Sequence, residues 1–324
     1  MENTLYDESP AILKDFLNYS ETIKNKSPNT IKEYFYDLRM FFRFLKIHNK
    51  IISLDKIDFN EITIHDIDIS LIQSVTLSDL YSFMSFVNRE RSNSSSARAR
   101  KVASLRSFFN YLTNKAKLLD INPAGELESP KIKKRLPKYL TVDESKQLLS
   151  VVDGKYSTRD FAIITLFLNC GMRLSELVGI NINNIKKDTL TIIGKGDKER
   201  TIYLNEACKA VIKAYLEIRP HNGVKDKNAL FLSERKQRIS NNMVQRIIKK
   251  YIIEAGLDPQ RYSTHKLRHT AATLMYKYGK VDIRVLQEIL GHESIATTEI
   301  YTHLDNQQLR DAVNSNPLSD FKNK

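Results

Sequence analysis

Four segments in the second half of the chain carry residue types that bind anions and move protons. In chain order they contribute Arg173, Glu176, Lys195, His265, Arg268, His292 and Tyr301. Guanidinium groups hold anionic oxygens through paired hydrogen bonds, histidine and lysine exchange protons, and a tyrosine hydroxyl can act as a nucleophile. Together these types are suited to nucleophilic and acid–base chemistry on an anionic substrate.

Each of these residues also has an ordinary structural interpretation. Arg173 and Glu176 are three positions apart, which is the spacing of a surface ion pair on a helix. Lys195 would be a solvated turn residue, and Tyr301 is one of 15 tyrosines, most of which must serve packing. The functional interpretation therefore depends on all four segments occurring together and in this order.

A metal site is a further alternative, because His265 and His269 are four apart and would share one helix face. The zinc-protease motif needs a glutamate directly after its first histidine. Lys266 stands there instead, and its ammonium would repel a cation without serving as a base. We therefore expect no metal site and no other cofactor.

Composition favours two domains and a polyanionic partner. The 324 residues include 51 Lys and Arg against 38 Asp and Glu, for a formal net charge of +13. Nucleic acid is the leading candidate partner, although surplus lysine alone is weak support. Cys170 and Cys208 are too few for a disulfide framework and are expected as core residues in a reducing compartment.

The first part of the chain is predicted to be helical. From about residue 10 to residue 118 apolar residues recur at helical spacing. Ser27, followed by Pro28, and the serines at 94–96 are good helix starts. Between these helices, residues 51–77 show no clear period and could hold a short helix or two loops.

Residues 121–138 combine three prolines with a basic run, so we place a linker there. After it, Thr141 opens a capping-box-like helix start, and the runs 189–193 and 200–204 alternate like hairpin strands. The longest apolar run, 161–168, is far shorter than the ~20 residues of a membrane span. With no secretory signal at the N-terminus, we expect a cytoplasmic protein without membrane attachment.

Taken together, the segments resemble the tyrosine recombinase, or phage integrase, family, and within it the XerC/XerD type. The motifs are Gly-Met-Arg-Leu-Ser-Glu-Leu, Gly-Lys-Gly-Asp-Lys-Glu-Arg, His-Lys-Leu-Arg-His-Thr, and Leu-Gly-His-Glu-Ser followed by Tyr-Thr-His. The resemblance extends to the helix start at residues 27–31, the helix at 100–112 and the end of the linker. It departs at residues 51–77, which look longer than the compact Xer pattern.

The resemblance implies a mainly α fold with a small β-hairpin in the C-terminal domain, arranged as a two-domain DNA clamp. Residues 1–120 would form a helical, SAM-like core-binding domain, and residues 121–138 a basic linker. Residues 139–304 would form the catalytic domain. Residues 305–324 would be a tail that docks on a neighbouring protomer or packs on its own domain.

In the family, the tyrosine matching Tyr301 attacks a DNA phosphate, forms a 3′-phosphotyrosine and releases a 5′-hydroxyl, without ATP. Arg173 and Arg268 would hold the charged phosphate oxygens and remove the need for magnesium. His265 would accept the tyrosine proton or hold an oxygen, and His292 would donate a further hydrogen bond.

The resemblance further assigns proton donation to the leaving oxygen to Lys195, with Lys198 as a weaker alternative. Glu176 would support its histidine and arginine neighbours. The partner is expected to be double-stranded DNA, bound as a homotetramer or as a heterotetramer with a sister recombinase. The candidate DNA contacts in the first domain, each of which could equally be a solvated helix residue, are Lys32, Arg98, Arg100, Lys101 and Arg106.

Two other functions share this residue set. A type IB topoisomerase-like enzyme would relax one duplex with the same arginine, histidine and tyrosine chemistry. A non-catalytic DNA-binding regulator could have the same fold, although the complete set of active-site residues argues against it. Chromosome dimer resolution, DNA inversion and element mobility all stay open as the biological role.

Overall fold

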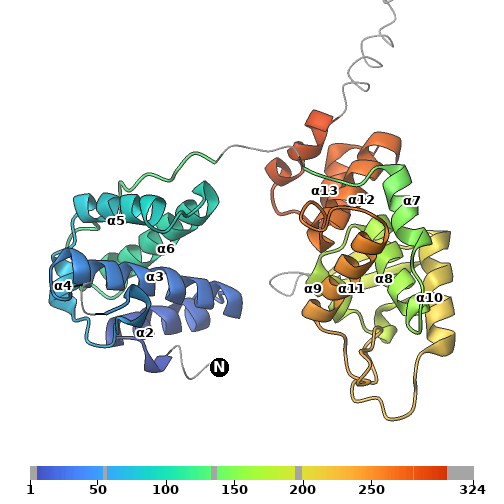
Figure 1. Cartoon of the computed structure of the whole chain (residues 1–324), viewed down its shortest axis with the longest axis horizontal. Coiled ribbons are helices and arrows are strands. Elements are labelled where there is room, and N and C mark those ends of the chain that lie inside the picture. The colour runs from blue at the N-terminus through green and yellow to red at the C-terminus, as the bar shows by residue number, and fades with distance from the viewer. Residues whose placement is uncertain (1–5, 54–56, 133–136, 194–198, 280, 305–324) are drawn as a thin grey trace, which may run out of the picture. The chain divides into compact units, whose positions relative to one another are not determined.

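The computed structural model describes residues 6–53, 57–132, 137–193, 199–279 and 281–304. The chain divides into two compact units, Met1–Lys134 and Arg135–Lys324. Lys195 and the tail after residue 304 lie outside the described residues. Figure 1 shows the elements of each unit.

The described residues of the first unit are helical, as the apolar spacing predicts. Its elements are α2 (Ala11–Asn18), a π-helical turn (Tyr19–Ile23), α3 (Pro28–His48), a 3-10 turn (Phe59–Glu61), α4 (Ile69–Gln73), α5 (Leu77–Arg89) and α6 (Ser95–Asn114). The Ser27 hydroxyl accepts from the Thr30 amide and caps α3, and Ser94 caps α6 in the same way through the Ala97 amide. Both serine caps are therefore confirmed as helix starts.

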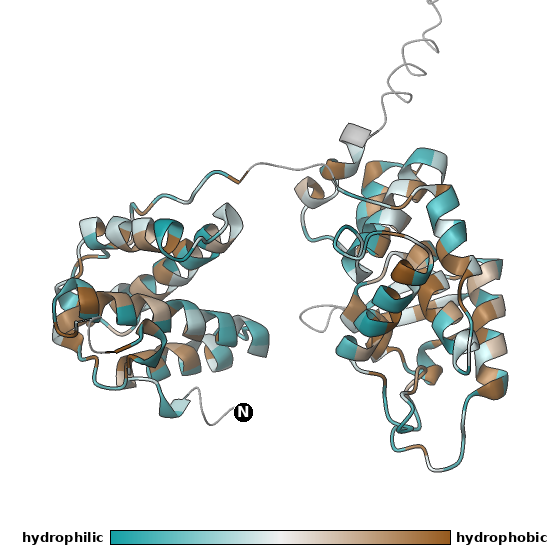
Figure 2. Cartoon of the chain, in the orientation of Figure 1, coloured by the Kyte–Doolittle hydropathy of each residue, from teal (hydrophilic) through white to brown (hydrophobic). Residues whose placement is uncertain are grey.

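A core rich in phenylalanine fills the first unit. Phe41 contacts the edges of Phe83 and Phe109, with ring centroids 5.2 and 6.0 Å apart, and Phe42 contacts Phe108 at 5.7 Å. All five rings are fully buried. Along the helices of both units, Figure 2 shows apolar and polar residues in alternation, which is the pattern of elements with one buried face.

Residues 51–77 contain both of the alternatives left open, a short helix (α4) and irregular stretches around it. This segment is fastened to α3 by two basic side chains. Lys46 Nζ donates to the Thr63 carbonyl at 2.8 Å and pairs with Asp66, and Arg43 donates to the Ile62 carbonyl at 2.8 Å. The longer segment is thus part of the first unit's packing.

A buried carboxylate on α3 binds the basic start of α6. Asp37 accepts from Lys101 Nζ at 2.8 Å, Arg100 at 2.7 Å and the Ser104 hydroxyl at 2.7 Å. The side chains of Asp37 and Lys101 are only 2% and 5% exposed. Lys101 therefore pairs inside the protein and is in no position to contact a DNA phosphate.

We predict that Asp37→Ala destabilises the first unit strongly. The substitution leaves the Lys101 ammonium buried without its counter-ion, which costs about 3–5 kcal/mol of stability. Glu33→Ala is the matched control, since Glu33 also pairs with Arg100 but is half-exposed and should cost about 0–1 kcal/mol. Urea unfolding of both variants measures the difference, and equal midpoints would contradict the prediction.

The second unit is mainly helical with one two-stranded sheet. Its elements are α7 (Val142–Ser150), α8 (Ser157–Cys170), α9 (Leu174–Gly179), β1 (Thr189–Ile193), β2 (Glu199–Tyr203), α10 (Glu206–Ile218), α11 (Asn241–Glu254), α12 (Thr264–Gly279), α13 (Ile283–Leu290) and 3-10 turns at Ile182–Asn184, Ile295–Thr297 and Glu299–Leu304. The strands are antiparallel, with Ile192 opposite Arg200. The predicted hairpin is confirmed, with the second strand one residue earlier than expected.

Helix α8 lies at the centre of this unit and packs against α10 and α12. Its apolar run is buried except at Phe161, so the predicted core helix is confirmed. Cys170 and Cys208 are buried free thiols with their sulfur atoms 3.6 Å apart. Among the helices of the described ranges, none is long and apolar enough to cross a membrane.

Candidate active site

Two motif glycines let the segments of the site approach one another. Gly171 ends α8 with φ +58°, and a Cβ there would lie 2.9 Å from a Leu290 methyl group. Gly291 ends α13 with φ +61°, and a Cβ there would lie 2.5 Å from the guanidinium of Arg200. Only glycine fits both the left-handed backbone and the close contact. The glycines therefore bring the start of α9 against the end of α13.

One buried carboxylate gathers three arginines, and we call these four residues the arginine cluster. Glu176 is 4% exposed, and its Oε1 accepts from Arg173 Nη1 at 2.8 Å. Its Oε2 accepts from the Arg173 backbone amide at 2.6 Å and from Arg200 Nη2 at 2.9 Å. Arg268 Nη1 is 3.7 Å from the same oxygen. These contacts link Glu176 to three arginines, and its supporting role toward a histidine stays a prediction.

The same three arginines bind three successive carbonyls at the end of α13. Arg200 donates to Ile289 at 2.8 Å, Arg268 to Leu290 at 2.7 Å and Arg173 to Gly291 at 2.9 Å. The last carbonyls of a helix have no partner within the helix and carry partial negative charge. The arginine cluster therefore fixes the end of α13 and the residues that follow it.

Three cations and one anion leave the arginine cluster with two positive charges. Burial, with the nearby Arg173 charge, lowers the pKa of Arg268 to about 10, so this guanidinium stays charged at neutral pH. Arg173 reaches the surface with its side chain 39% exposed, whereas Arg268 is 4% exposed. The cluster can bind an anion, with Arg173 nearest to solvent.

Helix α12 presents two histidines beside Arg268. His265 is exposed, and its ring meets that of His269 edge-on with centroids 4.5 Å apart. His269 Nδ1 lies 2.7 Å from the Tyr301 hydroxyl. Burial and the neighbouring His265 lower the pKa of His269 to about 3, so its ring is neutral and can accept the phenol proton. The contact to Tyr301 thus comes from His269, where we expected His265.

Tyr301 is buried in the small cluster formed with Ala272, Leu286 and Leu290 and is 1% exposed. Burial raises the pKa of its hydroxyl to about 12, although the charge of Arg268 acts in the opposite direction. The phenol therefore keeps its proton at neutral pH and needs an acceptor before it can attack. The Tyr301 side chain is thus covered by the protein.

His292 is linked to the tyrosine segment through Thr298. His292 Nδ1 lies 2.9 Å from the Thr298 hydroxyl, and the Thr298 carbonyl accepts from the Tyr301 amide at 3.0 Å. Burial and the arginine charges lower the pKa of His292 to about 4. His292 is therefore neutral and positioned with Tyr301.

The structure brings Arg173, Glu176, Arg268, His292 and Tyr301 together, with His265 at the edge of the group. Lys195 and Lys198 lie outside the described residues. Two further members, Arg200 and His269, were not among the predicted site residues. His269 had a usable signal, because it lies four positions after His265 and shares its helix face. Arg200 had no such signal in the sequence, apart from its place as the last residue of the Gly-Lys-Gly-Asp-Lys-Glu-Arg motif.

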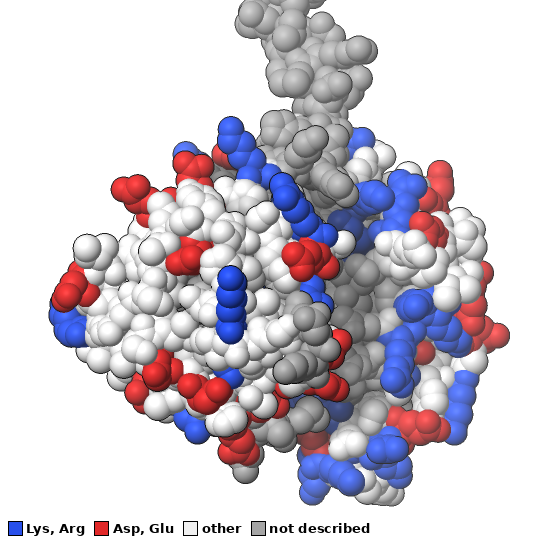
Figure 3. Space-filling model, turned by 60° about the vertical axis from the view of Figure 1, so that its left-hand side comes forward, with Lys and Arg blue, Asp and Glu red and all other residues white. Residues whose placement is uncertain are grey.

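The five candidate DNA contacts differ in their surroundings. Arg106 is exposed and Lys32 is partly exposed. Arg98 donates to Asn88 and to the Asn93 carbonyl, and Arg100 and Lys101 bind Asp37. On the face that Figure 3 shows, basic and acidic side chains are interspersed. We keep Arg106 and Lys32 as the stronger candidates and leave Lys101 out.

The described residues contain no group of three or more histidine, cysteine or acidic side chains able to hold a metal ion. His265 and His269 thus have no third ligand there, and His269 instead contacts Tyr301.

The two neutral histidines make stability depend on pH. The folded-state pKa values, about 3 for His269 and about 4 for His292, lie below the ordinary 6.5. As pH falls, these histidines are therefore protonated in the unfolded chain before they are protonated in the folded one. Their contribution to the free energy of unfolding is fully present above about pH 6.5 and is lost as pH falls toward 4. Thermal unfolding at a series of pH values should show this decline. His269→Asn should flatten it, and an unchanged slope would contradict the assignment.

Comparison with known proteins identifies the family. The model of the phage integrase family matches residues 138–308. A tyrosine recombinase XerC of Caldanaerobacter subterraneus is 62% identical over 310 residues, covering 96% of this chain and 88% of the relative. A tyrosine recombinase XerC of Thermodesulfovibrio yellowstonii is 36% identical over 95% of this chain and 96% of its own length.

Solved structures agree in fold. The XerH site-specific recombinase bound to difH substrate superposes with a TM-score of 0.68 at 24% identity, over 94% of this chain and 83% of that one. Neither a topoisomerase-like enzyme nor an inactive regulator is favoured by these comparisons. The chain belongs to the phage integrase family and is a site-specific tyrosine recombinase of the XerC/XerD type.

Proposed function

We propose that this recombinase binds double-stranded DNA and cuts one strand at a time by attack of the Tyr301 hydroxyl on a backbone phosphate. The observation that carries the proposal is the 2.7 Å contact between Tyr301 and the neutral His269, one residue from Arg268 in the arginine cluster. A nucleophile, a proton acceptor and an anion-binding group thus meet at one place.

The bond changes balance without an external energy source. The phenol oxygen forms a bond to phosphorus, the bond from phosphorus to the 5′-oxygen breaks, and the strand end is held as a 3′-phosphotyrosine. The phenol proton passes to a histidine, for which His269 is in contact and His265 is the exposed alternative. An incoming 5′-hydroxyl reverses the step and rejoins the strands.

Arg173 and Arg268 stabilise the negative charge that develops on the non-bridging oxygens. Arg173 is the more exposed and meets the phosphate first, whereas Arg268 and Tyr301 are buried. DNA binding therefore has to open the cover over Tyr301 before attack. His292 donates a further hydrogen bond from the nitrogen not engaged with Thr298.

The assembly is proposed from the resemblance to the family. Residues 1–120 bind DNA as a core-binding domain, the linker at 121–138 joins it to the catalytic domain at 139–304, and residues 305–324 dock on a neighbouring protomer. Four protomers on two DNA sites, either identical or shared with a sister recombinase, would complete recombination. We also propose that this reaction takes place in the cytoplasm.

Incubating the protein with host DNA in the presence of EDTA tests the proposal. We expect a covalent protein–DNA adduct that survives denaturation and whose DNA ends map to a small number of sequences. Relaxation of any supercoiled plasmid by the monomer, with no preferred site, would instead support the topoisomerase-like alternative.

Lys195 is proposed as the proton donor for the 5′-oxygen. Lys195→Ala should slow cleavage of ordinary DNA by a factor on the order of 10² to 10⁴. A substrate whose scissile 5′-oxygen is replaced by sulfur has a leaving group that needs no proton, so it should be cut by the variant at close to the wild-type rate. Lys198→Ala is the matched control and should cut both substrates normally. No recovery with the sulfur substrate would remove Lys195 from this role.

A further inference from the structure

Arg200 is the member of the arginine cluster to which neither the sequence motifs nor the proposed mechanism gives a role. It is the second residue of β2, and its side chain is 15% exposed. Its two terminal nitrogens are both engaged, one with Glu176 Oε2 at 2.9 Å and the other with the Ile289 carbonyl at 2.8 Å. The guanidinium therefore bridges the centre of the cluster and the end of α13.

A purely structural role does not account well for this residue. Its Nε is buried without a partner among the described residues, and burial lowers the pKa of its guanidinium. Both features cost free energy, and buried ion pairs can often be replaced by apolar side chains without loss of stability. A charged group kept at such a cost points to a functional constraint.

The geometry shows what Arg200 does to its neighbours. Glu176 Oε2 is occupied by Arg200 and by the Arg173 amide, and Arg268 Nη1 stays 3.7 Å away, beyond hydrogen-bond reach. Among the described residues, Arg200 is the one side-chain donor within hydrogen-bond reach of that oxygen, so its removal would leave that oxygen with the Arg173 amide alone. The Arg268 guanidinium, which now donates to the Gly171 and Leu290 carbonyls, would then move the short distance into a direct ion pair with Glu176. Its charge would then be neutralised by the carboxylate and turned away from the substrate.

We propose that Arg200 is a positioning residue for strand cleavage, which occupies Glu176 so that Arg268 stays out of a direct ion pair and keeps its charge for the scissile phosphate. Through the Ile289 carbonyl it also fixes the end of α13, and with it the placement of His292. This inference rests on the proposed cleavage reaction and adds a third arginine that acts through Glu176 without touching DNA.

The test measures single-turnover adduct formation at saturating DNA, on a nicked duplex carrying the site mapped from covalently trapped host DNA. Arg200→Ala should lower the rate by roughly 10- to 100-fold, as is typical for a group that orients a functional side chain, while the DNA concentration for half-saturation changes little. Arg200→Lys keeps the charge but can hold only one of the two partners, so it should recover part of the rate.

The decisive comparison combines Arg200→Ala with Glu176→Gln. If Arg200 acts by occupying Glu176, the double variant should be no slower than the slower of the two single variants. Losses that multiply, or an Arg200→Ala rate within twofold of wild type, would overturn the inference. An active wild-type protein and an inactive Tyr301→Phe protein in the same assay show that the proposed function holds whichever way Arg200 behaves.

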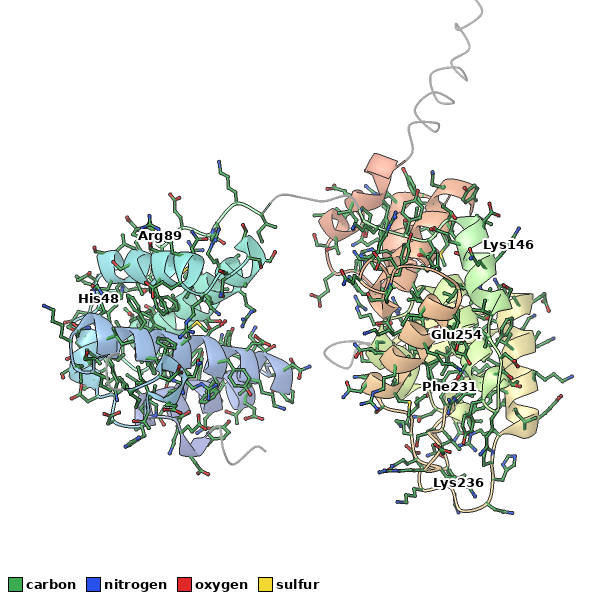
Figure 4. All side chains as sticks on the ribbon, viewed as in Figure 1. His48, Arg89, Lys146, Phe231, Lys236 and Glu254 are labelled. Atoms are coloured by element: carbon green, nitrogen blue, oxygen red, sulfur yellow. The ribbon has the colours of Figure 1, made fainter. Side chains whose placement is uncertain are left out.

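Arg219→Ala separates positioning from stability. Arg219 is 3% exposed and donates to the Ala229 and Leu230 carbonyls. These carbonyls adjoin Phe231, which lies toward the end of the second unit away from α13 (Figures 1 and 4). This variant should lower the melting temperature and leave the adduct rate unchanged at temperatures where it is folded. An equal loss of rate in both variants would mean that Arg200 serves stability only.

Discussion

Tyr301→Phe is expected to abolish the covalent protein–DNA adduct completely while leaving DNA binding almost unchanged. The substitution removes one oxygen, and with it both the nucleophile and the contact to His269. The phenyl ring still fills the pocket with Ala272, Leu286 and Leu290, so the second unit should stay folded. Denaturing gels of the protein with DNA measure the adduct, and mobility-shift gels measure binding.

The control for this experiment is Tyr278→Phe. Tyr278 lies on the same helix as His269 but is 68% exposed, so loss of its hydroxyl should change neither adduct nor binding. An adduct that persists in Tyr301→Phe would show that another residue attacks the phosphate. Loss of both adduct and binding would mean that the variant is misfolded, which circular dichroism and a melting curve decide.

Arg268→Ala should produce the second largest effect, a loss of cleavage rate on the order of a hundredfold to a thousandfold. Arg268 supplies charge for the phosphate and also donates to the Gly171 and Leu290 carbonyls at 2.8 and 2.7 Å. Its removal therefore leaves the transition state without one guanidinium and two buried carbonyls without a donor. Single-turnover adduct formation measures the rate, and thermal unfolding measures the structural cost.

Arg268→Lys should recover little of this loss. An ammonium is a point charge, and it cannot hold two carbonyls and face a phosphate in the planar geometry of a guanidinium. Arg261→Ala is the control, because Arg261 is an exposed arginine that precedes the same helix and lies over the Tyr262 ring. A normal rate in Arg268→Ala would remove this residue from the mechanism.

Local features of the fold could be predicted from the sequence because they depend on neighbouring residues. Ser27 and Ser94 start α3 and α6, and the capping box of Thr141 starts α7. Hairpin strands followed from the alternation at 189–193 and at 200–204. In each case the signal and the structure it specifies lie within a few residues.

Features that depend on tertiary pairing could not be predicted in this way. Lys101 looked like part of a basic helix face, but its partner Asp37 is 64 positions away. Arg200 looked like a strand residue of a hairpin, and its partners come from α9 and α13. His269, and not the predicted His265, contacts Tyr301 because of the way the 3-10 turn that carries Tyr301 packs against α12. Spacing gave the right helix face and could not choose between the two rings.

The burial of Tyr301 has a consequence for the safety of the genome. A recombinase that binds non-specific DNA while it searches for its site could nick that DNA at each encounter if the tyrosine hydroxyl were always exposed. Because that oxygen is buried among apolar side chains and hydrogen-bonded to an imidazole, a passing duplex would meet the more exposed Arg173 and His265 before it could reach Tyr301. Under the proposed mechanism, strand cleavage would then be confined to the rare DNA sites whose binding energy is sufficient to expose Tyr301.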